Sequence, residues 1–458
     1  MNTQPPGPVL SQRRAGVLLP ASALCNAQEG ALGGRARRFI DWLADAGFTV
    51  WQLLPLVPVD ESGSPYWARS DRAGNPALLD PQAPEPGNES DFEAWRNSQS
   101  AWLDDYLLFE AIAAEQGGKP WWQWPLSLRD RKPTALAQAA RRLDDPIRQL
   151  ARQQWRFDQQ WQALRDYAAA RGVHLFGDLP IYVAPDSMAT WVFRDQFQLD
   201  VNGEPRAVSG VPPDYFAADG QLWGNPLYDW ESQQRDGFRF WLLRLGLQAE
   251  RFDVLRIDHF RALEAYWEVP AGAQTAREGR WCTAPGEALL GTVRSKLPQL
   301  ELVAEDLGLI TDEVIALRKA FALPGMRVLQ FAFDGDGRNP HLPHMHEADV
   351  VAYTGTHDND TTAGWYAALG AEERDRVRRF LARADHEVLH ALTRAALGSV
   401  ARMAVLPAQD LLQLGSEARL NRPGTAKGNW SWRLQLEALT PELAAHYCEL
   451  NRLYGRVS

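Results

Sequence analysis

The sequence predicts an α/β fold, a (β/α)₈ TIM barrel with large helical and loop insertions on the C-terminal face of the barrel. Eight short apolar segments alternate with helix-like segments, as expected for parallel strands covered on both faces. Two intervals are longer than a barrel helix needs, which predicts the insertions. The eight predicted strands span residues 15–19, 48–54, 173–183, 254–260, 300–304, 326–333, 349–354 and 400–406.

Helical periodicity predicts barrel helices between these strands, for example over 35–46, 238–251 and 311–321. Thr311 precedes an apolar helical face and is therefore expected to be the N-cap of the last of these. Residues 434–458 are expected to form a helix that closes the barrel.

The predicted organisation is one catalytic barrel over 1–458 that contains two insertions. Helical patterns over 91–115 and 136–170 predict a helical insertion subdomain over 60–170. The segment 184–235 is rich in Pro, Gly, Asp and Trp and lacks periodicity, so it is expected to be a lid or substrate-binding loop.

Charge and cysteine content exclude several classes of partner and location. A formal net charge of −10 argues against nucleic acid or an anionic membrane as a partner. The sequence contains no run of 18 apolar residues, so we expect no membrane span. Residues 1–10 lack the pattern of a secretory signal. Three widely spaced cysteines fit a reduced protein, so we expect a cytoplasmic location.

The 19 tryptophans among 458 residues have two readings. Tryptophan can fill a core, or it can stack on the C–H faces of sugars. Trp121, Trp122 and Trp124 are flanked by prolines in a segment that looks too irregular for a buried helix. Both readings stay open for each of them.

Three acidic residues follow predicted strands at the barrel end where such enzymes carry their active sites. They are Asp258, Glu305 and Asp358. Retaining cleavage of a glycosidic bond requires a carboxylate nucleophile and a protonated carboxyl about 5–5.5 Å apart. Neighbouring strands can supply that separation, and a third carboxylate can bind hydroxyls of the distorted sugar. The pattern therefore indicates glycosidase chemistry.

Arg256 lies two residues before Asp258, so both side chains point the same way while Ile257 faces the helices. We expect the guanidinium to keep Asp258 ionised by lowering its pKa. Glu305 is expected to titrate at a higher pH, because the acid must stay protonated until the leaving group departs.

The sequence around these carboxylates resembles the amylomaltase (4-α-glucanotransferase, disproportionating enzyme) family of the α-amylase clan. Its three catalytic blocks look like Arg256-Ile-Asp-His-Phe-Arg261, Ala304-Glu-Asp-Leu-Gly308 and Gly355-Thr-His-Asp-Asn-Asp-Thr361. Further segments similar to that family in particular are Ser64-Pro-Tyr66, Gly74-Asn-Pro76, Phe176-Gly-Asp-Leu-Pro-Ile-Tyr-Val183, Gly210-Val-Pro-Pro-Asp-Tyr-Phe216 and Gly220-Gln-Leu-Trp-Gly-Asn-Pro226.

The resemblance implies a 4-α-glucanotransferase that works through a covalent glycosyl–Asp258 intermediate. It implies Glu305 as the general acid/base and Asp358 as the stabiliser of the distorted sugar. It also implies maltooligosaccharides and α-1,4-glucans as substrates, with glucose or maltose as acceptors, and no cofactor. The substrate-binding residues that it implies are Arg256, His357, Asp178, Ser64, Tyr66, Trp223 and Asn225.

The chain departs from the family pattern at a few positions. Ala262 stands where glycine is usual, and Trp67 stands where a polar residue is common. The sequence of residues 186–191 also differs slightly from the family pattern. None of these changes removes a catalytic group, but Trp67 leaves the detail of acceptor binding open.

Three other functions remain as alternatives. An α-amylase-type retaining hydrolase would use the same carboxylates with water as acceptor. A non-catalytic glucan-binding protein and an unrelated barrel enzyme are the others. We expect no metal, because His341, His344 and His346 have no acidic or cysteine ligand at regular spacing and the loop from Asp334 lacks the position-12 glutamate of a calcium site.

Overall fold

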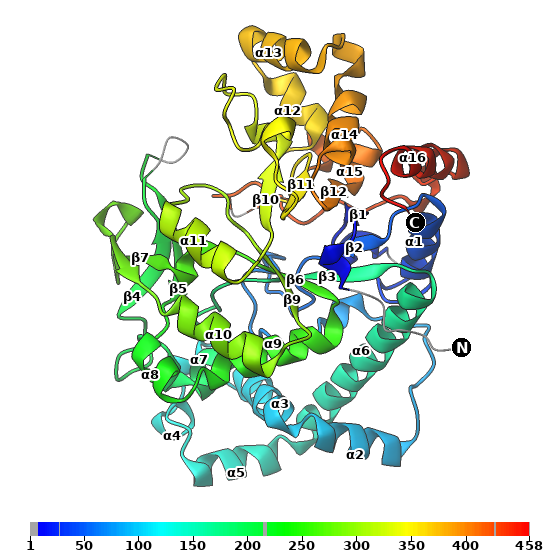
Figure 1. The fold of residues 1–458 in the computed structure, drawn as a ribbon. Coiled ribbons are helices and arrows are strands. Elements are labelled where there is room, and N and C mark those ends of the chain that lie inside the picture. Colours follow the sequence, from blue (N-terminus) through cyan, green and yellow to red (C-terminus); the bar gives the residue numbers. More distant parts are fainter. Residues whose placement is uncertain (1–7, 27, 214–217, 426, 458) are drawn as a thin grey trace.

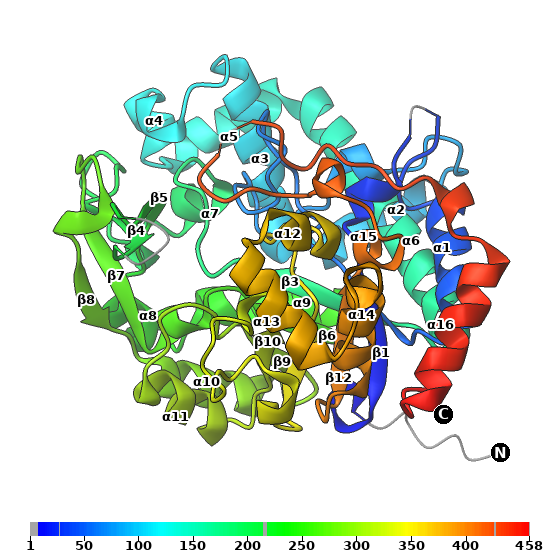
Figure 2. The same ribbon diagram turned by 90° about the horizontal axis from the view of Figure 1, so that it is seen from above.

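The structure is a computed structural model that describes residues 8–457 except 27, 214–217 and 426. Its centre is an eight-stranded parallel sheet in the order β10-β11-β12-β1-β2-β3-β6-β9. A hydrogen bond of 2.9 Å from Ala304 N to Pro324 O joins the two edges, so the sheet is nearly closed into a barrel (Figure 1 and Figure 2). The strands are β1 (Arg14–Leu18), β2 (Val50–Gln52), β3 (His174–Leu179), β6 (Val254–Ile257), β9 (Glu301–Ala304), β10 (Gly325–Val328), β11 (Val350–Tyr353) and β12 (Met403–Pro407).

All eight predicted strands are confirmed, but helices do not follow every one of them. Residues 329–349, between β10 and β11, contain only two 3₁₀ turns. Helix α11 begins after Thr311 as predicted, although the threonine side chain makes no capping hydrogen bond. Helices around the barrel are α1 (Gly34–Asp45), α9 (Arg239–Arg251), α10 (Gly286–Lys296), α11 (Asp312–Ala320), α14 (Val388–Gly398), α15 (Ala408–Leu411) and α16 (Pro441–Leu453).

The predicted C-terminal helix is present as α16, which packs against α1. The indole Nε1 of Trp42 on α1 donates to Thr440 O at the start of α16, at 3.2 Å. This contact brings the last helix beside the first one and completes the outer layer of the barrel.

Alternation of side chains along the strands produces two apolar layers. Side chains that point outward pack under the helices, whereas those that point inward fill the barrel. Near the carboxyl ends of the strands the inward positions become polar, with Gln52, Asp178 and Arg256 all buried. The apolar interior is formed mainly by Leu18, Val50, Phe176, Val254, Val303, Met326, Val328, Val351, Tyr353, Met403 and Val405.

Five helices lie between β2 and β3, in the interval where a helical insertion is predicted. They surround a separate apolar cluster that contains Trp121, Trp124 and Trp191, each at most 3% exposed. Sugar stacking is therefore wrong for Trp121 and Trp124, which are core residues. These helices are α2 (Glu89–Ser98), α3 (Ser100–Glu115), α4 (Leu126–Arg129), α5 (Pro133–Arg142) and α6 (Asp144–Ala170).

The segment 184–235 is more ordered than its lack of periodicity suggested. It contributes two strands to a four-stranded antiparallel sheet, of order β5-β4-β7-β8, that lies beside the barrel. The elements of this region are α7 (Met188–Val192), β4 (Ala207–Val211), β5 (Gln221–Pro226), α8 (Trp230–Arg235), β7 (Ala265–Pro270) and β8 (Arg280–Thr283).

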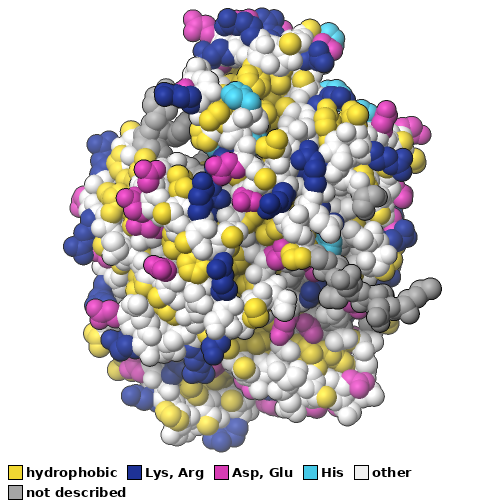
Figure 3. All heavy atoms as spheres, viewed as in Figure 1, with side chains coloured by type: hydrophobic (Ala, Val, Ile, Leu, Met, Phe, Trp, Pro, Cys, Tyr) yellow, Lys and Arg dark blue, Asp and Glu magenta, His cyan; other side chains and the backbone are white. Residues whose placement is uncertain are grey.

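Helices α12 (Thr362–Ala368) and α13 (Ala371–Leu381) form a lobe that projects from the barrel in Figure 1. Acidic and basic side chains are interspersed over the face shown in Figure 3, and no broad basic area appears there. Among the described helices, none combines the length and apolar character needed to cross a membrane.

Candidate active site

Two of the predicted catalytic carboxylates lie at the same level of the barrel, each directly after one of two neighbouring strands. Asp258 directly follows β6 and Glu305 directly follows β9. The two strands pair in parallel with Ile257 opposite Ala304, and Glu305 N donates to Ile257 O at 3.1 Å. The register of the barrel therefore brings these two side chains to one end of the barrel as neighbours.

The third carboxylate comes from a turn after β11. The side-chain oxygen of Asn359 accepts hydrogen bonds from the N–H of Thr356 at 2.9 Å and from its hydroxyl at 2.8 Å. This turn brings His357 and Asp358 over the barrel end, with His357 Nε2 3.4 Å from Asp358 Oδ2.

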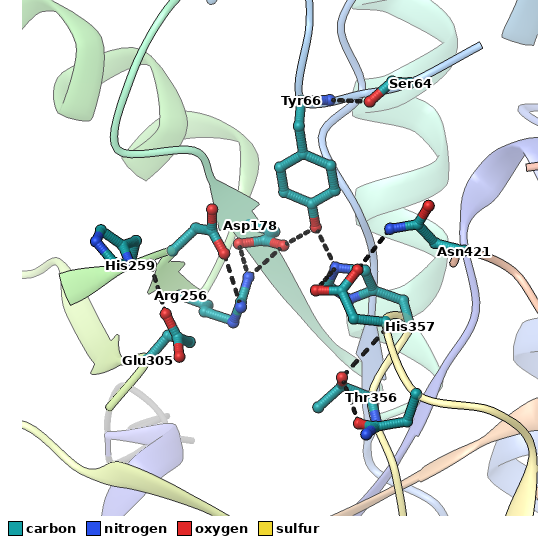
Figure 4. A network of polar contacts seen from close by, with 12 residues as sticks. Ser64, Tyr66, Asp178, Arg256, His259, Glu305, Thr356, His357 and Asn421 are labelled. Carbon is teal, nitrogen blue, oxygen red and sulfur yellow. Dashed lines mark hydrogen bonds and ion pairs between the residues drawn. The ribbon is translucent and has the colours of Figure 1, made fainter. Parts of the chain in front are cut away.

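One polar network connects the carboxyl ends of β3 and β6 with the turn after β11 (Figure 4). Arg256 Nη1 donates to both oxygens of Asp178 at 2.8 Å, and Arg256 Nη2 lies 2.8 Å from Asp258 Oδ1. The hydroxyl of Tyr66 donates to Asp178 Oδ2 at 2.6 Å and lies 2.8 Å from His357 Nε2. Residues far apart in the sequence are thus fixed relative to one another.

Burial changes the proton affinity of Asp258 against our expectation. Removal from water raises the pKa of Asp258 to about 8; Arg256 opposes that rise, while Asp178, Glu305 and Asp358 add to it. The guanidinium does lower the pKa of Asp258, as expected, but the expectation of a lowered net value is wrong, because burial outweighs that effect and the neighbouring carboxylates add to the rise.

Burial also raises the pKa of Glu305, in the direction expected for a general acid. Arg256 and two backbone donors oppose the rise: His259 N lies 2.6 Å from Oε2 and Leu307 N lies 2.9 Å from Oε1. Burial lowers the pKa of His357, so its neutral ring can donate Nε2–H to the oxygen of Tyr66.

The remaining predicted binding residues lie around this network with different contacts. Trp223 packs edge to face on His259, with ring centroids 4.7 Å apart. Ser64 accepts the N–H of Tyr66 at 3.3 Å and so supports the turn that carries the tyrosine. The amide of Asn225 is buried and donates to Val183 O at 2.9 Å, which ties β5 to the loop after β3.

Sequence reasoning missed three residues near Asp358 and His357, namely Arg419, Asn421 and Trp430. Asn421 Nδ2 donates to Asp358 Oδ1 at 2.7 Å, and Arg419 Nη2 donates to Asp358 O at 2.8 Å. The ring of Trp430 lies 6.1 Å from that of His357 and 6.0 Å from that of Tyr66. A signal was present: Trp430 and Trp432 closely follow Gly428 and Asn429 in a stretch without helical periodicity.

The histidine-rich loop after β10 uses its ring nitrogens within the protein. His341 Nδ1 accepts from Val328 N at 3.1 Å, and His346 Nδ1 lies 2.7 Å from the hydroxyl of Ser399. Over the described residues, no three His, Cys, Asp or Glu side chains converge on a possible metal position.

Comparison with known proteins gives consistent matches. A profile of the 4-alpha-glucanotransferase family matches residues 20–85 and 82–438. The 4-alpha-glucanotransferase of Thermus thermophilus is 45% identical, over 91% of this chain and 93% of that protein. That of a Synechocystis strain is 41% identical, over 98% and 99%. The structure of the amylomaltase from Streptococcus agalactiae in complex with acarbose superimposes with a TM-score of 0.93 at 31% identity, over 98% of this chain and all of that one.

Proposed function

Because the chain belongs to the 4-alpha-glucanotransferase family, we propose that it transfers segments of α-1,4-glucan by a retaining double displacement. The transferase activity on α-1,4-glucans is that of the family. The roles proposed for single residues depend on one observation: Asp258 and Glu305 leave adjacent strands side by side, with Arg256 against the first of them. Two carboxyls in that relation suit a nucleophile and an acid/base.

In the first half of the reaction, Asp258 attacks the anomeric carbon of the donor sugar. Glu305 gives its proton to the departing glycosidic oxygen, so that the shortened chain leaves as an alcohol and a glycosyl ester forms on Asp258. Burial raises the pKa of both carboxyls, which favours retention of a proton at the site. The productive arrangement has this proton on Glu305 and the charge of Asp258 beside Arg256.

In the second half, Glu305 is ionised and acts as the base. It removes the proton from the 4-hydroxyl of an acceptor sugar, and the hydroxyl oxygen attacks the anomeric carbon and releases Asp258. Two displacements at one carbon retain its configuration. The same residue serves as acid and then as base, so each cycle restores the starting protonation.

The other residues of the network hold the reacting sugar and the nucleophile. Asp358 is proposed to accept hydrogen bonds from ring hydroxyls that strengthen as the ring distorts. His357 and Tyr66 form the wall next to it, and the buried pair of Asp178 and Arg256 fixes the orientation of Asp258. Preorganised charges of this kind stabilise a developing positive charge without moving during the reaction.

The segment 184–235 is proposed as the cover of the acceptor side. Transfer needs an oriented sugar and little free water at the glycosyl ester, and an oriented group competes at an effective concentration of about 10⁵ M or more. Trp223 packs on His259, the residue that follows the nucleophile. Glucose and maltose are proposed acceptors. Tyr215 in the same segment is also proposed to stack on a sugar; this residue lies outside the described residues.

The deciding experiment is chromatography of the products formed from maltotriose alone. A transferase gives glucose together with a ladder of longer maltooligosaccharides, whereas a hydrolase gives glucose and maltose without longer chains. Glu305→Gln and Asp258→Asn should each abolish turnover, while Glu268→Gln on the outer sheet serves as the matched control. Wild-type turnover in either catalytic variant would contradict the assigned roles.

Two further proposals concern organisation and location. Residues 60–170 are proposed to be a helical insertion subdomain within a single catalytic barrel over 1–458, supported by their separate apolar cluster. A cytoplasmic location is proposed on the strength of Cys25, Cys282 and Cys448, which are all free thiols.

A further inference from the structure

His259, which directly follows Asp258, has a left-handed backbone with φ 49° and ψ 48°. This conformation is uncommon for residues other than glycine; asparagine, aspartate and histidine adopt it more readily than most residues, whereas β-branched residues are strongly disfavoured there. Such a residue next to a reacting group calls for an explanation in terms of what the backbone does there.

In this conformation the peptide N–H of His259 points at Glu305. His259 N lies 2.6 Å from Oε2, while Leu307 N lies 2.9 Å from Oε1. Both oxygens of Glu305 therefore accept a backbone hydrogen bond. Hydrogen bonds to the charged form of a carboxyl favour ionisation, and here they act against the effect of burial.

The side chain of His259 is held by the outer sheet. The ring of Trp223 on β5 packs on it edge to face, at 4.7 Å and 80°. Burial lowers the pKa of His259 to about 3, so the imidazole carries no charge at neutral pH. Its contribution is therefore its shape and the backbone conformation that this shape stabilises.

We infer that His259 is a positioning residue for the transfer of the glycosyl group to the acceptor. Trp223 holds the His259 ring, and the His259 N–H stays hydrogen-bonded to Glu305, so that Glu305 is ionised when the acceptor binds. The inference depends on the acid/base role proposed above for Glu305. It adds a physical connection between the segment that covers the acceptor side and the proton that the acceptor must lose.

The other charged groups around Glu305 belong to residues that the residue 259 variants leave unchanged. Arg256 on β6 and Asp258 directly after β6 both interact electrostatically with Glu305. Asp306, the next residue, is paired with Arg318 at 3.3 Å and with Arg327 at 3.4 Å. A change in the titration of Glu305 in a residue 259 variant therefore reports the backbone donor.

The experiment is the pH dependence of kcat/KM in His259→Val and His259→Asn. Valine disfavours the left-handed region, whereas asparagine tolerates it. With maltotriose as donor, the fall of kcat/KM at high pH, which is the basic limb of the pH profile, reports loss of the proton from Glu305. In His259→Val it should move upward by about one pH unit, the effect expected for one backbone donor. His259→Asn tolerates the left-handed backbone but loses the ring that packs on Trp223, so it should shift the limb upward by less than His259→Val does.

A donor with a fluoride leaving group separates this inference from the acid/base assignment. Fluoride leaves without protonation, so with α-maltosyl fluoride the wild-type basic limb should disappear. If it persists, the role of Glu305 is wrong; if it disappears but His259→Val leaves the maltotriose limb unmoved, the positioning role is wrong. Should His259→Val fail to fold, Trp223→Ala must shift the limb in the same direction, and an unmoved limb there overturns the inference.

Discussion

At the scale of single residues, the guanidinium of Arg256 serves two carboxylates at once. Nη1 donates to both oxygens of Asp178, and Nη2 lies 2.8 Å from Asp258. A lysine carries the same charge but has no planar fork, so it cannot satisfy both partners. We expect Arg256→Lys to lower kcat by about 100-fold, as misplaced catalytic groups do.

The matched control for this change is Arg280→Lys, which alters an exposed ion pair with Glu268 on the outer sheet. Its kcat on maltotriose should equal that of the wild type. If Arg256→Lys also kept wild-type kcat, charge alone would be sufficient and the bidentate geometry would have no part in orienting Asp258.

Asn421 offers a second test, because its amide is a donor to Asp358 Oδ1 at 2.7 Å. Asn421→Asp places a second acceptor and a second negative charge against this oxygen, whereas Asn421→Ser removes the contact without adding charge. We expect the aspartate variant to lose more kcat than the serine variant, and the difference to shrink at low pH as carboxyls protonate. Equal losses in both variants would exclude an electrostatic effect on Asp358.

The raised pKa of Asp258 predicts a pH-dependent stability. An unfolded aspartate titrates near pH 4, while in the folded protein the pKa is about 8. Below the unfolded value both states bind the proton; as the pH rises toward 8, only the folded state keeps it, so stability falls. Asp258→Asn should therefore increase the free energy of unfolding more at pH 8.5 than at pH 4.5, measured in urea. An equal gain at both values would mean that Asp258 titrates normally.

At the scale of elements, β5 is where the outer sheet approaches the barrel. Trp223 lies on this strand and packs on His259. Trp223→Ala should raise the ratio of hydrolysis to transfer, because removing the ring admits water and loosens the acceptor. Glucose released from maltotriose would be compared with redistribution of chain lengths. An unchanged ratio would count against a covering role for this strand.

Elements differ in how well the sequence predicts them, and the reason is their surroundings. Barrel strands such as β6 and β11 are buried on both faces, and so they appear as continuous apolar runs. Strands β4 and β5 contain Gly210, Gly224 and Pro226 and leave part of their surface exposed. Strand β4 pairs with β7, whose partner residues lie 57 to 63 residues further along the chain, and no local pattern reveals this pairing.

The same argument applies to the site. Asp258, Glu305 and Asp358 could be predicted because each follows a recognisable strand. Asn421 lies 63 residues after Asp358 in the sequence and outside any regular element. Only the folded chain shows that they meet. The pKa of Asp258 was mispredicted for a related reason. The sequence shows the charge of Arg256 two residues away, but it does not show how deeply Asp258 is buried.

At the scale of the whole molecule, tryptophans serve two separate purposes. Trp121 and Trp124 of the helical insertion fill its core, together with Trp191 from α7. Trp223 and Trp430 instead lie next to the catalytic network. The high tryptophan content thus reflects a second hydrophobic core as much as sugar binding, and composition alone could not divide it between the two.

Trp191 connects this second core to the barrel, which leads to a prediction about the molecule as a unit. It lies on α7, after β3, and is fully buried among the helices of the insertion. Its Nε1 donates to Leu128 O at 3.1 Å, and the guanidinium of Arg131 lies 4.3 Å from its ring. Trp191→Ala should lower the free energy of unfolding by about 3–5 kcal/mol, the range for a buried aromatic truncated to alanine.

Turnover on maltotriose, measured well below the unfolding transition, should be unchanged in Trp191→Ala, because the catalytic carboxylates follow barrel strands. Trp281→Ala, at a tryptophan that is 38% exposed, should cost much less stability and serves as the control. A loss of turnover in Trp191→Ala without a loss of stability would show that the insertion shapes the active site directly. The helical core would then be part of the catalytic machinery, as well as a support for the folded chain.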